Sequence, residues 1–229
     1  RSNMTEALLP IRDKDYAWNN CEDEMSVPIV GDYTFRRRWF KLRNQCTFST
    51  FLIPRFLPDT PHKMLTIGVF EGAQEVWMMQ NLLKHPDSRL FCIDPWQATS
   101  KLDQKFMDEC RENAAKNLSQ WSSQVNLQQG YSQDIMQGAV EDGAYLGQAM
   151  GTFDFVIIDG DHCAEPVYQD AVNAFAFLKP GGWMLFDDVR NQVPKQDHVK
   201  EGLEKFLPEY ANRVKFVWAH RFCDCYEKL

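Results

Sequence analysis

The sequence predicts a doubly wound α/β fold with a mostly parallel sheet, and two observations carry this prediction. The stretch from Phe153 to Val189 holds an apolar run, a helical pattern and a second apolar run, which is the pattern of a βαβ unit. Earlier, the short apolar run Met64–Gly72 passes directly into a helical pattern over residues 73–84. Strands that are buried on both faces appear as continuous apolar runs, so these strands are expected to run parallel.

The N-terminal part is expected to stand outside this sheet. Residues 1–31 lack a clear period and are predicted to form an irregular arm, whereas residues 32–56 have helical spacing, with Asp32 as the cap. Pro54, Pro58 and Pro61 then interrupt the chain before the first strand. We therefore divide the chain into an N-terminal arm and helix, residues 1–60, and a sheet domain, residues 61–229.

The remaining elements follow from period and breakers. Apolar runs predict further strands at 90–93 and 125–127. Amphipathic spacing predicts helices at 102–121, from Ser132 (a candidate cap), over the stretch that contains Val167 to Leu178, and at 198–210. The Lys179–Gly182 segment, with its proline and two glycines, is expected to end the helix before the strand 183–186. Alternation at 214–219 and 222–226 predicts a closing hairpin that turns at His220 and Arg221.

Composition limits the classes of partner and the location. The net charge of −7 argues against nucleic acid or an anionic membrane as the main partner. The seven cysteines are scattered without a disulfide framework, which is typical of reduced intracellular thiols. Since neither a membrane-spanning run nor a signal-peptide pattern is found, a cytoplasmic location is expected. An aromatic-rich arm and helix outside the sheet favour a homodimer, although the oligomeric state is open.

Acidic residues follow both strands of the central βαβ unit. Asp159, Asp161 and His162 come after the first strand, and Asp187 and Asp188 come after the second. Parallel strands place their carboxyl ends at one edge of the sheet, where ligands of open α/β sheets bind. Several carboxylates in one place favour a cation between them, so the pattern indicates a metal site with oxygen ligands. Solvated turns and helix caps are the alternative interpretation.

The first two strands predict a nucleotide site. Gly68 and Gly72 allow a close approach of the backbone to a ligand, although a simple strand-to-helix turn explains them about as well. Asp94 ends the second strand about 20 residues further on, the usual place of an acid that binds ribose hydroxyls. Trp96 beside it either covers an adenine face or belongs to the core.

Taken together, these motifs resemble the class I S-adenosylmethionine-dependent methyltransferases. The segments that carry the resemblance are Ile67–Gly72, Asp94–Trp96, Ile158–His162, and Leu178–Gly182 leading to Asp187 and Asp188. The small metal-dependent O-methyltransferases, which include the macrocin and related sugar enzymes, are the most similar, and catechol O-methyltransferase is more distant. The resemblance implies a Rossmann-like methyltransferase fold with a seven-stranded sheet.

The resemblance also implies roles for individual residues. The positions implied to bind S-adenosylmethionine are Thr66, Gly68, Glu71, Gly72, Asp94, Trp96, Ser132 and Asp159. Thr66 stands where the family usually has an acid. Asp159, Asp187 and Asp188 match the positions that hold Mg²⁺ or a similar divalent ion. Asp161 matches the general base of the sugar enzymes, and His162 is the alternative base.

The resulting hypothesis is metal-assisted O-methylation of a small molecule that bears a hydroxyl, such as a sugar, a polyol or a catechol. Three alternatives stay open. The first is a metal-independent methyltransferase with His162 as the base, and the second is a module that binds the cofactor without catalysis. The third is a nicotinamide-dependent enzyme, which the incomplete three-glycine fingerprint disfavours.

Overall fold

The computed structural model describes residues 26–190 and 198–229. The chain forms two compact units, one ending at Gly130 and the other beginning at Tyr131. Most of the predicted arm, residues 1–25, lies outside the described residues, as do residues 191–197 of the polar segment after Asp188. The division at residue 60 stays a prediction.

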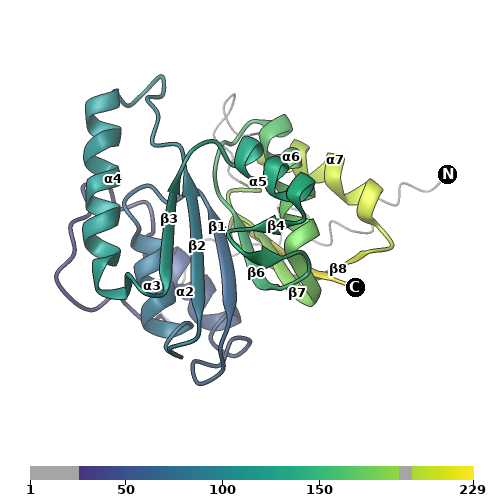
Figure 1. The fold of residues 1–229 in the computed structure, drawn as a ribbon, viewed down its shortest axis with the longest axis horizontal. Coiled ribbons are helices and arrows are strands. Elements are labelled where there is room, and N and C mark those ends of the chain that lie inside the picture. The colour runs from purple at the N-terminus through teal and green to yellow at the C-terminus, as the bar shows by residue number, and fades with distance from the viewer. Residues whose placement is uncertain (1–25, 191–197) are drawn as a thin grey trace. The chain divides into compact units, whose positions relative to one another are not determined.

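The unit that ends at Gly130 contains the first three strands of the sheet. The strand β1 (Lys63–Ile67) pairs in parallel with β2 (Arg89–Asp94), and β2 pairs in parallel with β3 (Val125–Gln129). The helices are α2 (Leu42–Phe51), α3 (Ala73–Asn81) and α4 (Gln104–Leu118), which a short 3-10 turn, η2 (Ser119–Trp121), extends. Figure 1 shows the three strands side by side with α4 alongside.

The predicted helix over residues 32–56 is correct only in its central part. The helix α2 begins at Leu42, with Lys41 as its cap, and ends at Phe51, so the predicted cap Asp32 lies outside the helix. The backbone N–H groups of Arg36 and Arg37 donate to the side chain of Glu71, at 2.8 and 3.0 Å. A distant carboxylate therefore satisfies amides that a helix would use, and tertiary contacts override the helical period.

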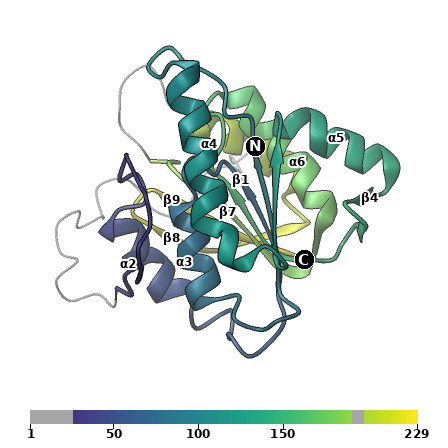
Figure 2. The ribbon, with the colours of Figure 1, turned by 60° about the vertical axis from the view of Figure 1, so that its left-hand side comes forward.

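The unit that begins at Tyr131 holds four strands of the sheet. The strand β6 (Phe153–Ile158) pairs in parallel with β7 (Leu178–Phe186), and β9 (Cys223–Lys228) pairs antiparallel with both β7 and β8 (Val214–His220). Its helices are α5 (Ser132–Asp142), α6 (Ala164–Phe177) and α7 (Val199–Tyr210), and β4 (Ala144–Tyr145) with β5 (Gln148–Ala149) forms a small hairpin. Figure 2 shows α5 and α6 next to each other.

The predicted fold class is confirmed: the sheet has seven strands, is mostly parallel and ends in an antiparallel hairpin. Three local predictions are wrong. The Lys179–Gly182 segment does not precede the strand, because β7 begins at Leu178 and includes this segment. Ser132 is the first residue of α5, and Tyr131 is its cap. The closing hairpin turns at Arg221 and Phe222, because β8 continues through His220. Arg221 supplies the positive φ of 55° that this tight turn needs.

Aromatic and aliphatic side chains fill the core. Trp77, Phe155 and Phe186 are almost completely buried, as the continuous apolar runs predict. Across the two described ranges of the chain, no helix combines the length and the apolar character that crossing a membrane requires.

The contact between α6 and α7 generates the first testable prediction. A Cβ added to Gly202 of α7 would lie 2.6 Å from the carbonyl oxygen of Ala164 and 2.7 Å from Cβ of Val167. Gly202→Ala is therefore expected to lower the free energy of unfolding by about 1–3 kcal/mol in urea denaturation.

The matched control is Gly138→Ala in α5, where an added Cβ meets nothing within 4 Å. This variant is expected to gain up to about 1 kcal/mol from helix propensity. Equal effects of the two substitutions would show that α6 and α7 are not closely packed at Gly202.

Candidate functional site

The register of β6 with β7 places two acidic turns at one edge of the sheet. Ile158 is opposite Phe186, and the N–H of Asp187 donates to the carbonyl of Ile158 at 3.1 Å. Both strands thus end at the same level, and Asp159 and Asp188 follow directly. The sequence predicts that Asp159, Asp161, His162, Asp187 and Asp188 converge, and the structure brings three of them, Asp159, His162 and Asp188, into one cluster.

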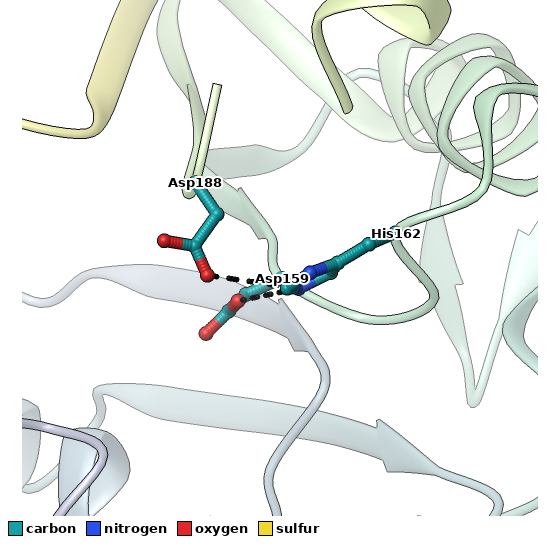
Figure 3. Close-up of side chains that lie close together, drawn as sticks. All are labelled: Asp159, His162 and Asp188. Atoms are coloured by element: carbon teal, nitrogen blue, oxygen red, sulfur yellow. Dashed lines mark ion pairs between the residues drawn. The ribbon is translucent and has the colours of Figure 1, made fainter. Parts of the chain in front are cut away.

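Asp159, His162 and Asp188 form one cluster, which Figure 3 shows in close-up. One potential ligand atom of each residue lies within 4.8 Å of the others. The Nε2 atom of His162 is 3.8 Å from Oδ1 of Asp159 and 3.8 Å from Oδ2 of Asp188. All three side chains are half-buried, so the cluster is accessible to a ligand. Two carboxylates that face one imidazole favour a positive charge between them, carried by a metal ion or by the protonated ring.

The backbone around the cluster is held on both sides. The N–H of His198, just before α7, donates to the carbonyl of His162 at 2.9 Å. The N–H of Val189 donates to the carbonyl of Phe222 in the hairpin turn at 2.8 Å. Next to it, the guanidinium of Arg190 forms a buried ion pair with Asp224 at 2.9 Å. These contacts fix the loops that carry His162 and Asp188.

Asp187, a predicted metal ligand, is placed differently from its neighbour. It is almost buried, and its Oδ1 accepts hydrogen bonds from the thiol of Cys223 at 3.1 Å and from the N–H of Asp188 at 2.9 Å. Burial, and then the charge of Asp159, raises its pKa to about 6, while the bonds from Cys223 and Asp188 lower it. Asp187 is outside the three-residue cluster, and its role as a metal ligand stays a prediction.

Asp161, the predicted base, also has a structural partner. Its Oδ1 accepts a hydrogen bond from the N–H of Cys163 at 2.8 Å, at the start of α6. Its side chain is exposed and lies outside the cluster around His162. The structure therefore brings His162, rather than Asp161, into contact range of Asp159 and Asp188. The choice of base stays open.

Asp170 of α6 is a buried acid that sequence reasoning missed. It is completely buried, and its Oδ1 accepts a hydrogen bond from the side chain of Gln133 at 2.9 Å. Burial raises its pKa to about 7, the hydrogen bonds from Ser132 and Gln133 lower it, and the charge of Asp161 raises it further. Ser132, one of the positions implied to bind S-adenosylmethionine, thus contacts this acid.

In the other unit, Asp94 organises the predicted cofactor loop. Its Oδ2 accepts hydrogen bonds from the N–H groups of Val69 and Phe70, at 2.8 and 2.9 Å, and its Oδ1 accepts one from Trp96 at 2.7 Å. A carboxylate offers about four acceptor positions, so about one remains on Oδ1. This geometry fits a ribose hydroxyl as the fourth donor. Burial is the main influence on the pKa of Asp94 and raises it, while the three backbone bonds lower it.

The loop between β1 and α3 needs unusual backbone conformations. Gly68, Phe70 and Gly72 all have positive φ, at 92°, 56° and 79°. A Cβ on Gly72 would also press against Leu118 of α4, at 3.2 Å. The two motif glycines are therefore required by the turn itself. Trp96 is buried, and its Nε1–H donates to the carbonyl of Phe70 at 2.7 Å, which favours the core interpretation of this residue.

Glu71 links this loop to the segment before α2. Its Oε2 accepts hydrogen bonds from the N–H groups of Arg36 and Arg37, and its Oε1 accepts one from the side chain of Asn113 at 2.9 Å. Asn117, one turn further along α4, donates to the carbonyl of Glu71 at 2.9 Å. Glu71 is buried and thus holds the loop and the basic segment together.

Thr66 is fully buried in the middle of β1, opposite Cys92 of β2. Burial raises the pKa of the Cys92 thiol well above its usual range, the charge of Glu75 raises it further, and the neighbouring hydroxyl of Thr66 lowers it. The Oγ1 atom of Thr66 is itself buried and has no hydrogen-bond partner among the described residues. Its predicted contact with the cofactor stays a prediction.

The sequence analysis did not predict several of these contacts, and only one of them corresponds to a recognisable spacing in the sequence. Asn113 and Asn117 are one helical turn apart in a predicted amphipathic helix, a spacing that places them on one face. The bond from Cys223 to Asp187 and the pairing of Arg190 with Asp224 join residues that are distant in the chain. Only the sheet topology reveals these pairs.

Comparison with known proteins identifies a family. Residues 65–189 match the family model described as a methyltransferase domain. An uncharacterised protein of Acanthamoeba polyphaga mimivirus is 27% identical over 127 residues, which is 55% of this chain and 50% of that protein. The chain thus spans about half the length of the curated relative it matches.

Solved structures are similar in fold. The O-methyltransferase of Bacillus cereus, in complex with SAH, is 20% identical with a TM-score of 0.55, covering 80% of this chain and 81% of that one. The MycE methyltransferase of the mycinamycin pathway, in complex with Mg, SAH and mycinamycin VI, is 18% identical with a TM-score of 0.50, covering 79% of this chain and 49% of that one. At these identities the likeness is one of fold.

The buried acid at Asp170 generates a prediction for pH dependence. Its pKa of about 7 exceeds that of an unfolded Asp, about 4, so the folded protein binds the proton more tightly. Stability is therefore expected to fall as the pH rises from about 4 to about 7. The amide side chain of Asp170→Asn is neutral at every pH, so the variant does not lose this stability as the pH rises. The difference in unfolding free energy, variant minus original protein, should therefore increase by roughly 3 kcal/mol between pH 5 and pH 8, at about 1.4 kcal/mol per pKa unit.

Urea denaturation at both pH values measures this difference. Asp142→Asn removes an exposed acid from α5 and serves as the control, with a difference that is expected to be independent of pH. A pH-independent difference for Asp170→Asn as well would mean that Asp170 is ionised in the folded protein throughout this range.

Proposed function

Because the chain belongs to the methyltransferase domain family, we propose that it transfers a methyl group from S-adenosylmethionine to a hydroxyl oxygen of a small molecule. The observation that carries the choice of oxygen is the cluster of Asp159, His162 and Asp188. An alcohol is a weak nucleophile until its proton is removed, and this cluster combines a base with two carboxylates. The acceptor class, a sugar, polyol or catechol, comes from the sequence resemblance.

The donor is proposed to bind at the loop between β1 and α3. The residues that would hold it are Gly68, Gly72 and Asp94, with Glu71 fixing the loop from behind. Asp94 contributes its remaining acceptor position to a hydroxyl, and the loop amides that it binds are already ordered. When bound, S-adenosylmethionine supplies a methyl group on a positively charged sulfur, which leaves as a neutral thioether. Because the displacement is in line, the rigidity of this loop contributes mainly by positioning.

A divalent ion fits the acidic cluster. Asp159 and Asp188 offer carboxylate oxygens, and His162 offers an imidazole nitrogen within the same 4.8 Å. Oxygen ligands suit Mg²⁺, and the added nitrogen also suits Mn²⁺ or another first-row ion. When bound, such an ion lowers the pKa of a hydroxyl that coordinates it. The presence of Mg in the MycE complex is consistent with this proposal.

A second mechanism uses the same residues without a metal. His162 accepts the proton of the acceptor hydroxyl at Nε2, and Asp159 and Asp188 stabilise the imidazolium that forms. The equal distances of 3.8 Å from Nε2 to the two carboxylates favour this role. In both mechanisms the acceptor oxygen bonds to the methyl carbon as the bond from carbon to sulfur breaks.

A homodimer and a cytoplasmic location remain part of the proposal.

Calorimetric titration of S-adenosylhomocysteine tests the donor site. We expect micromolar binding to the original protein and at least about 10-fold weaker binding to Asp94→Asn, because the amide cannot accept all three backbone N–H groups and a hydroxyl. Asp59→Asn, at an exposed turn, is the control and should bind normally. Absence of binding to a folded original protein would refute the donor assignment.

Two variants, assayed with catechol and sugar acceptors, separate the two mechanisms. If a metal is required, a chelator and Asp188→Asn should each lower kcat by about 100-fold, and Mn²⁺ titration should show binding that Asp188→Asn loses. His162→Gln would then reduce both metal binding and activity. If His162 is the base without a metal, the chelator has no effect while His162→Gln is inactive.

Asp161→Asn completes this set of variants. Loss of activity with metal binding retained would identify Asp161 as the base.

A further inference from the structure

A pocket of about 420 Å³ lies in the unit that ends at Gly130, apart from the residues so far assigned to donor or metal binding. The segment between Pro28 and Gln45 forms most of its lining, and Ala73 at the start of α3 completes it. This volume is within the range of about 300–1,000 Å³ that is typical of small-molecule sites.

The charge of this pocket is positive. Arg37, Arg38 and Lys41 line it, and none of its lining residues, all in the described part of the chain, is acidic. Arg36, by contrast, is directed elsewhere, to an ion pair with Glu109 and to the face of Phe106. Within residues 26–190 and 198–229, neither Arg38 nor Lys41 forms an ion pair. The guanidinium of Arg37 also lies over Phe106, 5.6 Å from the ring centroid, so the positive charge of the pocket comes mainly from Arg38 and Lys41. In a chain with net charge −7, these cations indicate an anionic ligand.

Aromatic rings form the rest of the wall. Tyr33, Phe35 and Phe40 all line the pocket. The rings of Tyr33 and Phe35 are nearly parallel, with centroids 6.0 Å apart and an angle of 21°. Such walls accept a planar or sugar ring that carries the anionic group.

The pocket is ordered without a ligand. The hydroxyl of Tyr33 accepts hydrogen bonds from the side chains of Gln80 and Gln120, at 3.0 and 2.8 Å. The backbone of Val30 exchanges two hydrogen bonds with Gln80, and the carbonyl of Val27 accepts one from the indole of Trp77 at 2.7 Å. These contacts hold the segment on α3. The free protein has therefore already lost most of the conformational entropy that ligand binding would otherwise cost.

We propose that this pocket binds an anionic small molecule, other than the methyl donor, through a phosphate or carboxylate group whose attached ring packs on Tyr33, Phe35 and Phe40. Arg38 and Lys41 bind the anion directly. Arg37 connects the pocket to the cofactor loop, since it is a lining residue whose backbone N–H donates to Glu71. The anion belongs to the methyl acceptor or to a separate ligand, and either source uses the same contacts.

Calorimetric titration with phenyl phosphate tests the proposal, with phenyl glucoside as the neutral counterpart. Phenyl phosphate should bind, and the double variant Arg38→Gln/Lys41→Gln should bind it at least about 10-fold more weakly, because each substitution removes a charge-assisted hydrogen bond to the anion. The double variant Lys101→Gln/Lys105→Gln removes two exposed cations from the same unit and should bind within about twofold of the original protein.

Four outcomes would overturn the proposal: no binding by the folded protein, equal loss in both double variants, equal binding of the neutral glucoside, or complete competition by S-adenosylhomocysteine. Inorganic phosphate should bind more weakly than phenyl phosphate, and equal affinity would refute the aromatic part. Repeating the titration with the protein saturated in S-adenosylhomocysteine separates the ligands, because complete competition would assign the pocket to the methyl donor.

The proposed function is tested independently of this pocket. If the protein binds the donor but not phenyl phosphate, the anion site is refuted and the proposed methyl transfer is unaffected. If it binds phenyl phosphate but not the donor, the donor assignment is refuted and the anion site is unaffected. If methyl transfer is then found, a lower KM for phosphorylated acceptors, abolished in Arg38→Gln/Lys41→Gln, would identify the acceptor as the source of the anion.

Discussion

The parallel register of β6 with β7 is the constraint on which the acidic cluster depends. Ile158 and Phe186 are the last paired residues, and the hydrogen bond from Asp187 to the carbonyl of Ile158 extends the pairing by one step. A shift of one residue in this pairing would turn every side chain of the shifted strand to the opposite face of the sheet. The acids after the two strands would then no longer face His162. The chemistry of the cluster therefore depends on apolar packing in two strands that contain none of its residues.

Most acids near the predicted sites stabilise backbone turns. Asp94 accepts three amides, and Glu71 accepts two amides and an asparagine. Asp161 and Asp187 each accept at least one amide. A carboxylate at the end of a strand thus has two uses, as a loop organiser and as a ligand. Asp159 and Asp188 differ from these four because their carboxylates face the imidazole of His162.

The sequence predicted the fold class and the convergence at the end of β6 and β7 because both follow from local pattern and the rules of parallel sheets. The apolar runs and the proline and glycine breakers locate the strands well, and handedness does the rest. The helix predicted from Asp32 does not form in its first part, although the helical spacing is present in the sequence. The carboxylate of Glu71, 35 residues after Arg36, binds the backbone N–H of Arg36 instead. Local period contains no information about such a distant acceptor.

The candidate site was predictable in its residue types and less so in its detailed pairing. Asp159, His162 and Asp188 follow strands directly, so topology alone brings them together. The bond between Asp187 and Cys223 depends on which residue of β9 is opposite the end of β7, and an antiparallel register cannot be derived from composition. The anion pocket is similar in this respect. Its cations are evident in the sequence, but the hydrogen bonds that hold the segment on Trp77, Gln80 and Gln120 are not.

Backbone strain marks the same loops as the side-chain chemistry. Phe70, Trp96 and Asp188 are three of the few non-glycine residues with positive φ, and each lies at a predicted site. Such conformations cost about 1–3 kcal/mol each and persist only where several contacts enforce them. For Phe70 these contacts are its amide on Asp94, its carbonyl on the indole of Trp96 and its ring, stacked 4.1 Å from that of Trp39.

The stacking partner connects this strain to the N-terminal segment. Trp39 is 53% exposed although its ring covers Phe70, and it lies between Arg38 and Phe40, which line the anion pocket. One short extended segment therefore contacts the cofactor loop at two points, through Trp39 on Phe70 and through the amides bound by Glu71. A ligand that binds Arg38 and Lys41 acts on this segment, and the loop that it braces is the loop proposed to position the methyl donor. Coupling between two binding sites is reciprocal. If an anion in the pocket strengthens donor binding by ordering the loop, the donor would therefore strengthen anion binding by the same factor.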